Sequence, residues 1–300
     1  MTARKPLPFA LRNGPFAVTD ARARDVAASR LRASDLAAPF HGTRMSIDAP
    51  PELSLLCRAL AARMPRGAFC FSHATAAMLW GMPLPHRLQA GPLHVMVPWP
   101  KRAPRVAGVV GHAVRSTPRI HVFTGLPLLP PADTWCQLST LLSLDELVEA
   151  GDRLRDRQRQ LCTSEAIAAA VDRYGARRGA RNLRDAVGLI RERVESPRET
   201  RVRLLLVRAG LPEPAVNEEI FDVTGRLIAI GDLVYRRYKV VVEYEGEHHR
   251  RDSVQFARDV DRYNDLAEDG WTPIRVTKEM ASTDIVGRTR RALIAAGWRP

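Results

Sequence analysis

The segment at residues 227–245, LIAIGDLVYRRYKVVVEYE, specifies how the carboxy-terminal part of this chain folds. It contains two apolar runs of β-strand character, which the four residues 236–239 separate. Two such runs with a short loop between them predict a β-hairpin. A pairing of Tyr235 with Val240 across the loop determines on which face of the sheet each remaining side chain of the hairpin lies, because side chains alternate between the two faces along a strand.

That register places Asp232 directly opposite Glu243, with Glu245 on the same face two residues further on. Cross-strand partners have Cβ atoms roughly 4.5 to 5.5 Å apart, close enough for two carboxylates to share a divalent cation. Like charges at this distance destabilise a sheet unless a cation or a proton intervenes. The hairpin therefore predicts an acidic, metal-binding site on one face of a sheet whose other face is apolar. The alternative is a set of solvated acids on an edge strand.

The residues around the hairpin predict a small domain of mixed helices and strands at 196–300. From Ser196 onward the pattern indicates a helix, three strands, a helix, a strand and a final helix. A mixed order with a single late crossover favours an α/β (α+β) class, in which helices pack on a central sheet.

Glu199 has two interpretations. The stretch Ser196-Pro197-Arg198-Glu199 fits a helix capping box, with Pro at the first helical position and Glu at the third. The functional interpretation instead requires this helix to lie across the sheet, so that Glu199 approaches the pair of acids on the hairpin. The sequence leaves both interpretations open.

Several of these stretches resemble the acidic motif of the PD-(D/E)XK nuclease superfamily, in its very-short-patch-repair-like branch. They are SPRET with Glu199, IGDLVY with Asp232, and VVVEYEGEHH with Glu243 and Glu245. The resemblance extends over about residues 195–280 and includes FARDVDRYNDLAEDGWTPIRVT. It implies a restriction-endonuclease-like αβββαβ core in which Glu199, Asp232 and Glu243 bind Mg²⁺ (or Mn²⁺).

The sequence departs from the superfamily at Glu245, which stands where the superfamily has a Lys, although this branch commonly lacks that Lys. His248 and His249 follow closely, and an imidazole suits proton transfer near neutral pH. We therefore count Glu245, His248 and His249 with the metal ligands as candidate catalytic residues; a His pair at a turn is also common without any function. Basic side chains nearby could hold phosphate or pair with the acids: Arg258, Arg262 and Arg275.

Residues 1–125 predict a second, DNA-binding domain. Apolar spacing indicates helices at 20–37, 51–63 and 72–80, and β-like runs follow at 93–98 and 109–115. Three helices followed by a basic hairpin is the order of a winged helix. The stretches FSHATAAMLWGMPLP and PFHGTR resemble the winged-helix domain of AbiEi-type antitoxins. A helix-patterned connector at 126–195 begins at the Pro-rich segment GLPLLPPAD.

The charge distribution points to a polyanionic partner. The chain has a formal net charge of +13, and residues 1–190 carry 26 Lys and Arg against 14 Asp and Glu. Residues 191–300 carry 20 against 19, so nearly all of the basic excess precedes the acidic site. A strongly basic protein most often binds nucleic acid or an anionic surface. We expect DNA, with phosphate contacts from three residues: Arg102, Arg105 and Arg115.

Other features narrow the class of protein. No apolar run approaches the 18 residues that a membrane span needs, and the opening residues lack the apolar stretch of a secretory signal. The four Cys residues are widely separated, which favours reduced thiols in a cytoplasmic protein. The sequence thus predicts a cytoplasmic, DNA-binding, magnesium-dependent endonuclease. The alternative is a non-catalytic, antitoxin-type regulator that retains the nuclease fold, and the oligomeric state is not indicated.

Overall fold

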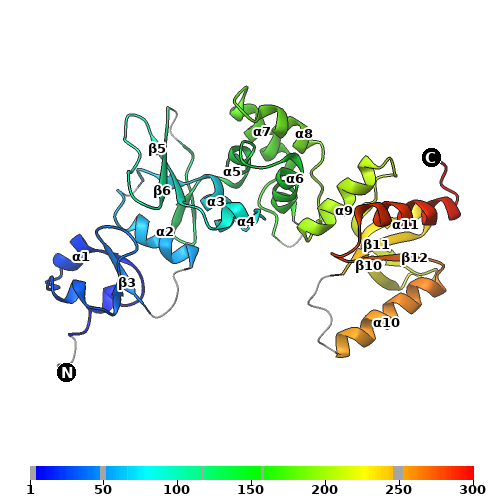
Figure 1. Cartoon of the computed structure of the whole chain (residues 1–300), viewed down its shortest axis with the longest axis horizontal. Coiled ribbons are helices and arrows are strands. Elements are labelled where there is room, and N and C mark those ends of the chain that lie inside the picture. Colours follow the sequence, from blue (N-terminus) through cyan, green and yellow to red (C-terminus); the bar gives the residue numbers. More distant parts are fainter. Residues whose placement is uncertain (1–4, 48–51, 66, 116–117, 157–158, 246–252) are drawn as a thin grey trace. The chain divides into compact units, whose positions relative to one another are not determined.

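The computed structural model describes the backbone of residues 5–47, 52–65, 67–115, 118–156, 159–245 and 253–300, and the side chains of all but 253–260 within these ranges. The chain divides into two compact units, Met1–Leu141 and Leu142–Pro300, which we call the amino-terminal and carboxy-terminal units. The division falls inside the segment predicted as a connector. Both units mix helices and strands, so the protein belongs to the α+β class (Figure 1). In the described part of the chain, no helix is long and apolar enough to cross a bilayer.

The first part of the amino-terminal unit is a small three-stranded antiparallel sheet in the order β1-β3-β2, with short helical turns around it. Its elements are η1 (Phe9–Leu11), β1 (Phe16–Ala17), α1 (Val18–Arg22), η2 (Arg30–Arg32), β2 (Leu36–Ala37) and β3 (Thr43–Ser46). The helix predicted at 20–37 is therefore wrong beyond its first turn. Asp25 adopts a positive φ of 57°, which ends α1, and the apolar side chains that follow pack around Leu11 and Phe16 from separate short segments.

The second part of this unit is a five-stranded mixed sheet in the order β6-β5-β4-β8-β7. Its elements are α2 (Leu53–Ala61), β4 (Cys70–Phe71), α3 (His73–Leu79), α4 (His86–Gln89), β5 (Leu93–Pro98), β6 (Val109–Val114), β7 (His121–Phe123), β8 (Leu126–Leu128) and α5 (Pro131–Leu138). The helices predicted at 51–63 and 72–80 correspond to α2 and α3.

The pairing of β5 with β6 corrects the predicted wing. The two strands pair in parallel, from Leu93 with Val109 to Pro98 with Val114, whereas a wing is an antiparallel hairpin. The connection at 99–108 passes back along the sheet, and Gly111 makes room for it. A Cβ atom on Gly111 would lie 2.7 Å from the Cβ of Ala103 and 3.0 Å from the carbonyl oxygen of Pro104.

The carboxy-terminal unit begins with helices that were predicted as the connector: α6 (Leu144–Asp152), η3 (Arg153–Arg155), α7 (Ser164–Tyr174) and α8 (Ala180–Val187). A capping box between Ser143 and Glu146 starts α6. The buried Asp152 at the end of α6 accepts a hydrogen bond from the Thr200 hydroxyl at 2.7 Å and pairs with Arg203 at 3.3 Å. These contacts attach α6 to the next helix, α9 (Pro197–Arg208), so the helical segment is part of this unit.

The remainder of the unit has the predicted αβββαβα order. After α9 come β9 (Ala215–Phe221), β10 (Leu227–Tyr235), η4 (Arg236–Tyr238), β11 (Val240–Tyr244), α10 (Ser253–Glu268), β12 (Thr272–Val276) and α11 (Ser282–Ala295). The strands form one sheet in the order β12-β11-β10-β9, in which only β11 and β12 are parallel among the described pairs. Figure 1 shows α9 and α11 on one side of this sheet and α10 on the other.

Both faces of this sheet are apolar. Val240 and Val242 pack in a cluster with residues of α9 and α11, whereas Val234 and Val241 pack with Leu266 of α10. The acids of the hairpin were predicted to oppose the apolar face. That is correct for the α9 and α11 side, but the second cluster adjoins the acids on their own face, so Glu243 is buried and Asp232 and Glu245 are half-buried.

Candidate active site

The hairpin has the register that its sequence predicts. Tyr235 pairs with Val240 and Leu233 with Val242, so Asp232 and Glu243 occupy the next pair of positions on β10 and β11. On the other side of β10, Leu233 pairs with Val216 and Gly231 with Glu218. Asp232 therefore lies between the acid of β11 and the residue at position 217 of β9, in the middle of the sheet.

The carboxylate of Asp232 is held by the backbone and surrounded by like charge. Its Oδ2 accepts a hydrogen bond from the backbone N–H of Tyr244 at 2.7 Å. The pKa of Asp232 is raised to about 7, chiefly by burial and in addition by the carboxylates of Glu199 and Glu243, while the hydrogen bond from Tyr244 and the charge of Arg262 act in the opposite direction. The side chain thus gains or loses a proton near neutral pH, which an exposed Asp does not do.

Glu243 is only 4% exposed, and its two oxygens differ. Its Oε2 accepts hydrogen bonds from Nη2 of Arg262 at 2.9 Å and from the hydroxyl of Tyr263 at 2.5 Å, both on α10. Its Oε1 is buried and has no hydrogen-bond partner among the described residues. An unpartnered, buried carboxylate oxygen is costly unless a proton or a cation serves it.

Glu199 lies in a capped helix, but its side chain does not complete the predicted capping box with the backbone N–H of Ser196. Its backbone N–H donates to Oγ of Ser196 at 3.3 Å, so the helix cap is real. Its Oε2, however, accepts from the backbone N–H of Glu195 at 3.1 Å and from Nδ2 of Asn217 at 2.6 Å. Burial raises its pKa. Since Asn217 lies at the position of β9 beside Asp232, the start of α9 is brought to the hairpin acids.

The three carboxylates are neighbours without forming a ready-made coordination shell. Among the described residues, the set of three ligand atoms that lie within 4.8 Å of one another consists of histidines, and Glu199, Asp232 and Glu243 do not form such a set. A cation bound by all three would have to draw their side chains together.

The remaining predicted site residues have different outcomes. Glu245 forms an ion pair with Arg275 of β12. His248 and His249 lie outside the described residues. The sequence left open whether Arg258, Arg262 and Arg275 hold phosphate or pair with the acids. Arg262 pairs with Glu243 and Arg275 with Glu245, while the side chain of Arg258 lies outside the described residues.

Sequence reasoning missed Asn217 and Tyr263. Asn217 is 3% exposed and adopts a positive φ of 45°, which only a known backbone reveals. Tyr263 adjoins Arg262 on α10, and burial together with Glu243 raises the pKa of its hydroxyl, so it acts as a hydrogen-bond donor to that carboxylate. The only sign in the sequence that Tyr263 belongs to the site is its position next to Arg262.

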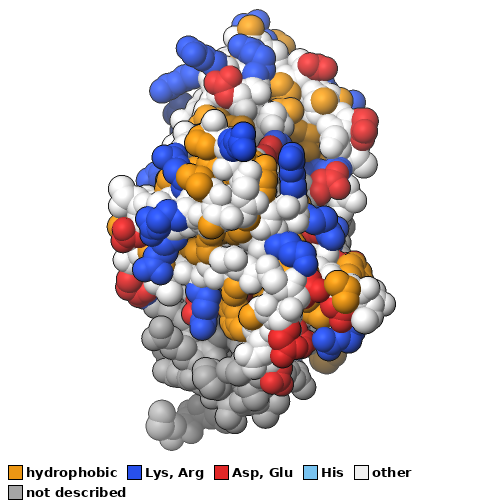
Figure 2. Space-filling model, turned by 90° about the vertical axis from the view of Figure 1, so that its right-hand side faces the viewer, with side chains coloured by type: hydrophobic (Ala, Val, Ile, Leu, Met, Phe, Trp, Pro, Cys, Tyr) orange, Lys and Arg blue, Asp and Glu red, His pale blue; other side chains and the backbone are white. Residues whose placement is uncertain are grey.

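The predicted DNA contacts lie on the amino-terminal unit. Arg102, Arg105 and Arg115 are exposed, and none forms a hydrogen bond or ion pair with another described residue. Arg102 and Arg105, with Lys101, line an open groove between the 99–106 segment and β6. By contrast, the face in Figure 2, seen from the side of the C terminus, mixes basic and acidic side chains and carries no large patch of one sign.

Comparison with known proteins adds little about function. No family model matches the sequence. Two uncharacterized Mycobacterium tuberculosis proteins, MT2308 and Rv2248, are each 25% identical to this chain over 202 residues, which are 67% of this chain and 72% of theirs. The crystal structure of the RV2827C protein from the same organism covers 70% of this chain and 84% of its own, at 20% identity and a TM-score of 0.40. These similarities assign neither a family nor an activity.

Proposed function

We propose that this protein is a DNA-binding, divalent-cation-dependent phosphodiesterase whose reactive centre is formed by Glu199, Asp232 and Glu243. The observation that carries the proposal is the placement of two acids, Glu199 of α9 and Glu243 of β11, around the half-buried Asp232 of β10, whose pKa is raised to about 7. Strong perturbation of a buried acid by other acids is typical of functional sites.

The donor set fits a hard cation such as Mg²⁺ or Mn²⁺, which prefers carboxylate oxygens. Oε1 of Glu243 has no partner among the described residues, and the second oxygen of Asp232 is not engaged by the backbone bond from Tyr244. A cation bound by Asp232 and Glu243, with Glu199 beside them, would polarise a phosphoryl oxygen and lower the pKa of a water molecule.

The protein's own side chains would orient this centre. Tyr263 and Arg262 hold Oε2 of Glu243 and leave Oε1 free, while the N–H of Tyr244 holds Asp232. Asn217 and the N–H of Glu195 hold Glu199. The exposed arginines of the amino-terminal unit, Arg102, Arg105 and Arg115, would bind the phosphate backbone of DNA.

A second candidate function is DNA binding without catalysis. It is favoured by the ion pairs that already neutralise two of the acids, Arg262 with Glu243 and Arg275 with Glu245. In a protein of this kind the nuclease-like fold would serve as a scaffold, and the acids would stabilise it through these pairs.

The test combines cation binding with cleavage on the full-length protein. We expect Mg²⁺ or Mn²⁺ to raise the thermal midpoint of the wild type, because a ligand that binds only the native state stabilises it. We also expect nicking of supercoiled plasmid. Asp232→Asn and Glu243→Gln should each abolish both effects, whereas Asp261→Asn, an exposed acid of α10, should abolish neither.

The outcomes separate the two candidates. DNA binding without cation-dependent stabilisation and without cleavage of any DNA form would overturn the phosphodiesterase and favour the regulator. Cleavage that persists in Asp232→Asn would show that the reactive centre lies elsewhere.

A further inference from the structure

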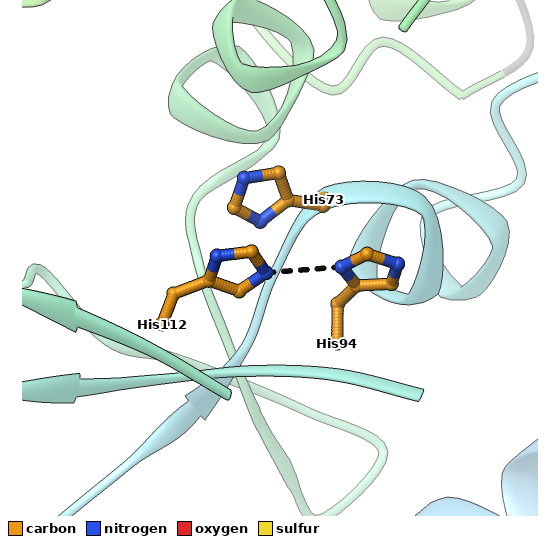
Figure 3. Close-up of side chains that lie close together, drawn as sticks. All are labelled: His73, His94 and His112. Carbon is orange, nitrogen blue, oxygen red and sulfur yellow. Dashed lines mark hydrogen bonds between the residues drawn. The ribbon is translucent and has the colours of Figure 1, made fainter. Parts of the chain in front are cut away.

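Three histidines meet in the amino-terminal unit, far from the acids in sequence. His73 is the first residue of α3, His94 lies on β5 and His112 on β6 (Figure 3). Met96 pairs with His112 in the parallel ladder, and Met96 is two residues from His94, so the two strand histidines share one face of the sheet. The helix α3 packs against β5 and brings His73 over them.

The imidazole nitrogens converge. Nδ1 of His94 lies 3.0 Å from Nε2 of His112, and one ring nitrogen of each of the three residues lies within 4.8 Å of the others. The His73 ring stacks on that of His112, with centroids 4.0 Å apart. All three side chains are partly exposed, so solvent and small solutes can reach them.

The rings are uncharged at neutral pH, as metal ligands must be. Burial, together with proximity to His112 and His94, lowers the pKa of His73 to about 3. Burial also lowers the pKa of His94 and of His112, and His112 lowers that of His94 in addition. No carboxylate is hydrogen-bonded to any of the three rings among the described residues, so their arrangement is not that of a charged His pair with an acid.

The backbone around the cluster is held independently of the rings. The N–H of Ser72 donates to the carbonyl of His94 at 3.0 Å, and the N–H of His94 donates to the hydroxyl oxygen of Thr75 at 2.8 Å. These bonds join the start of α3 to β5.

His73 itself is held in a strained conformation. Its φ is +48°, and its N–H donates to Oε1 of Gln137 at 2.9 Å. A positive φ is strained for a non-glycine residue, and such strain clusters at functional sites. Nδ1 of His73 is the ring nitrogen that faces the other two rings in Figure 3, and it lies 3.1 Å from Oγ of Ser72. A metal bound by this nitrogen would take the place of the contact with Ser72.

We propose that His73, His94 and His112 bind one transition-metal ion of the zinc class, through one nitrogen each, with a fourth position open to water. Imidazole suits Zn²⁺, Co²⁺, Ni²⁺ and Cu²⁺ and not Mg²⁺, so this site differs in its metal from the acidic centre. Two nitrogens on a tetrahedral zinc lie about 3.3 Å apart. The 3.0 Å separation of His94 and His112 is close to this value. A bound metal would replace their hydrogen bond, and the rings would turn so that their lone pairs point at the ion.

The test uses untagged full-length protein, stripped with a chelator and then titrated with Zn²⁺ by calorimetry. We expect one equivalent to bind, and Co²⁺ to give the intense visible absorption of a tetrahedral complex. His94→Gln and His112→Gln should each weaken binding by more than the roughly 10- to 100-fold that loss of a second-shell partner costs. The matched control is His86→Gln, because His86 is an exposed histidine of the same unit.

Two further variants keep the result interpretable. Asp232→Asn should retain zinc binding, so a failure of the acidic centre does not affect this test. His73→Asn should lose binding while permitting the positive φ, since Asn tolerates that conformation. Far-ultraviolet circular dichroism checks that each variant folds. The proposal is overturned if the wild type binds no stoichiometric metal, or if binding and the cobalt spectrum survive in the folded histidine variants.

Discussion

Replacing Asp232 by Asn should make the metal-free protein more stable at alkaline pH and change its response to pH. Burial among acids raises the pKa of Asp232 from its ordinary 3.8 to about 7. Below 3.8 both the folded and unfolded states are protonated at this residue, so it contributes nothing. Between these two values the unfolded chain has released its proton and the folded one has not, so stability falls as pH rises. Above about pH 7 Asp232 is ionised in both the folded and the unfolded state, so stability falls no further.

The magnitude follows from the two pKa values. One pKa unit corresponds to about 1.36 kcal/mol, so the ionised Asp232 costs the fold roughly 4 kcal/mol above pH 7. At pH 5 the loss is only about 1.5 to 2 kcal/mol, because the folded side chain still holds its proton. The amide oxygen of Asn can accept the bond from Tyr244, while its NH₂ group costs about 1 kcal/mol or more if it finds no acceptor. That cost is independent of pH.

The assay is urea unfolding of wild type and Asp232→Asn in chelator at pH 5 and pH 8.5. Hydrogen exchange of peptides from β10 and β11 reports the carboxy-terminal unit separately from the other unit. We expect the free energy of unfolding of Asp232→Asn, relative to that of the wild type, to increase by about 2 to 3 kcal/mol from pH 5 to pH 8.5. Titration of the groups that do not interact with Asp232 cancels in this comparison, and Asp261→Asn serves as the exposed control. An advantage that is the same at both pH values would refute the reasoning.

The remaining predictions concern the framework and the DNA surface. Arg203→Met should cost about 3 to 5 kcal/mol, because it leaves the buried Asp152 without its cation; urea unfolding measures this, and adding Asp152→Asn should recover part of the loss. Gly231→Ala should cost about 1 to 3 kcal/mol by thermal unfolding, since its Cβ would lie 2.5 Å from Cγ2 of Val241; an unchanged midpoint would contradict the packing. Removing three exposed arginines, Arg102, Arg105 and Arg115, should weaken the dependence of DNA affinity on salt. The slope of log affinity against log salt concentration should fall by about 0.9 for each phosphate that is no longer neutralised. Fluorescence anisotropy measures this slope, and an unchanged slope would place the DNA-binding surface elsewhere.

The hairpin at 227–245 and the αβββαβα order around it could be predicted from the amino-acid sequence alone. The reason is that the relevant interactions are local. A short loop and a period of two leave one register that buries Leu233, Tyr235, Val240 and Val242 together, and that register sets Asp232 against Glu243. The ion pairs of Arg262 with Glu243 and of Arg275 with Glu245 could also be proposed, since opposite charges on neighbouring elements attract.

Other features required the three-dimensional structure, because they depend on residues distant in sequence. The apolar spacing at 20–37 is compatible with a helix, but burial against Leu11 and Phe16 distributes those residues over α1, η2 and β2. The direction of β6 relative to β5 depends on a close approach at Gly111 that no local pattern encodes. His73, His94 and His112 likewise have no common sequence motif. The parallel pairing and the packing of α3 bring them together, because side-chain convergence in a sheet is set by register between strands and not by spacing along the chain.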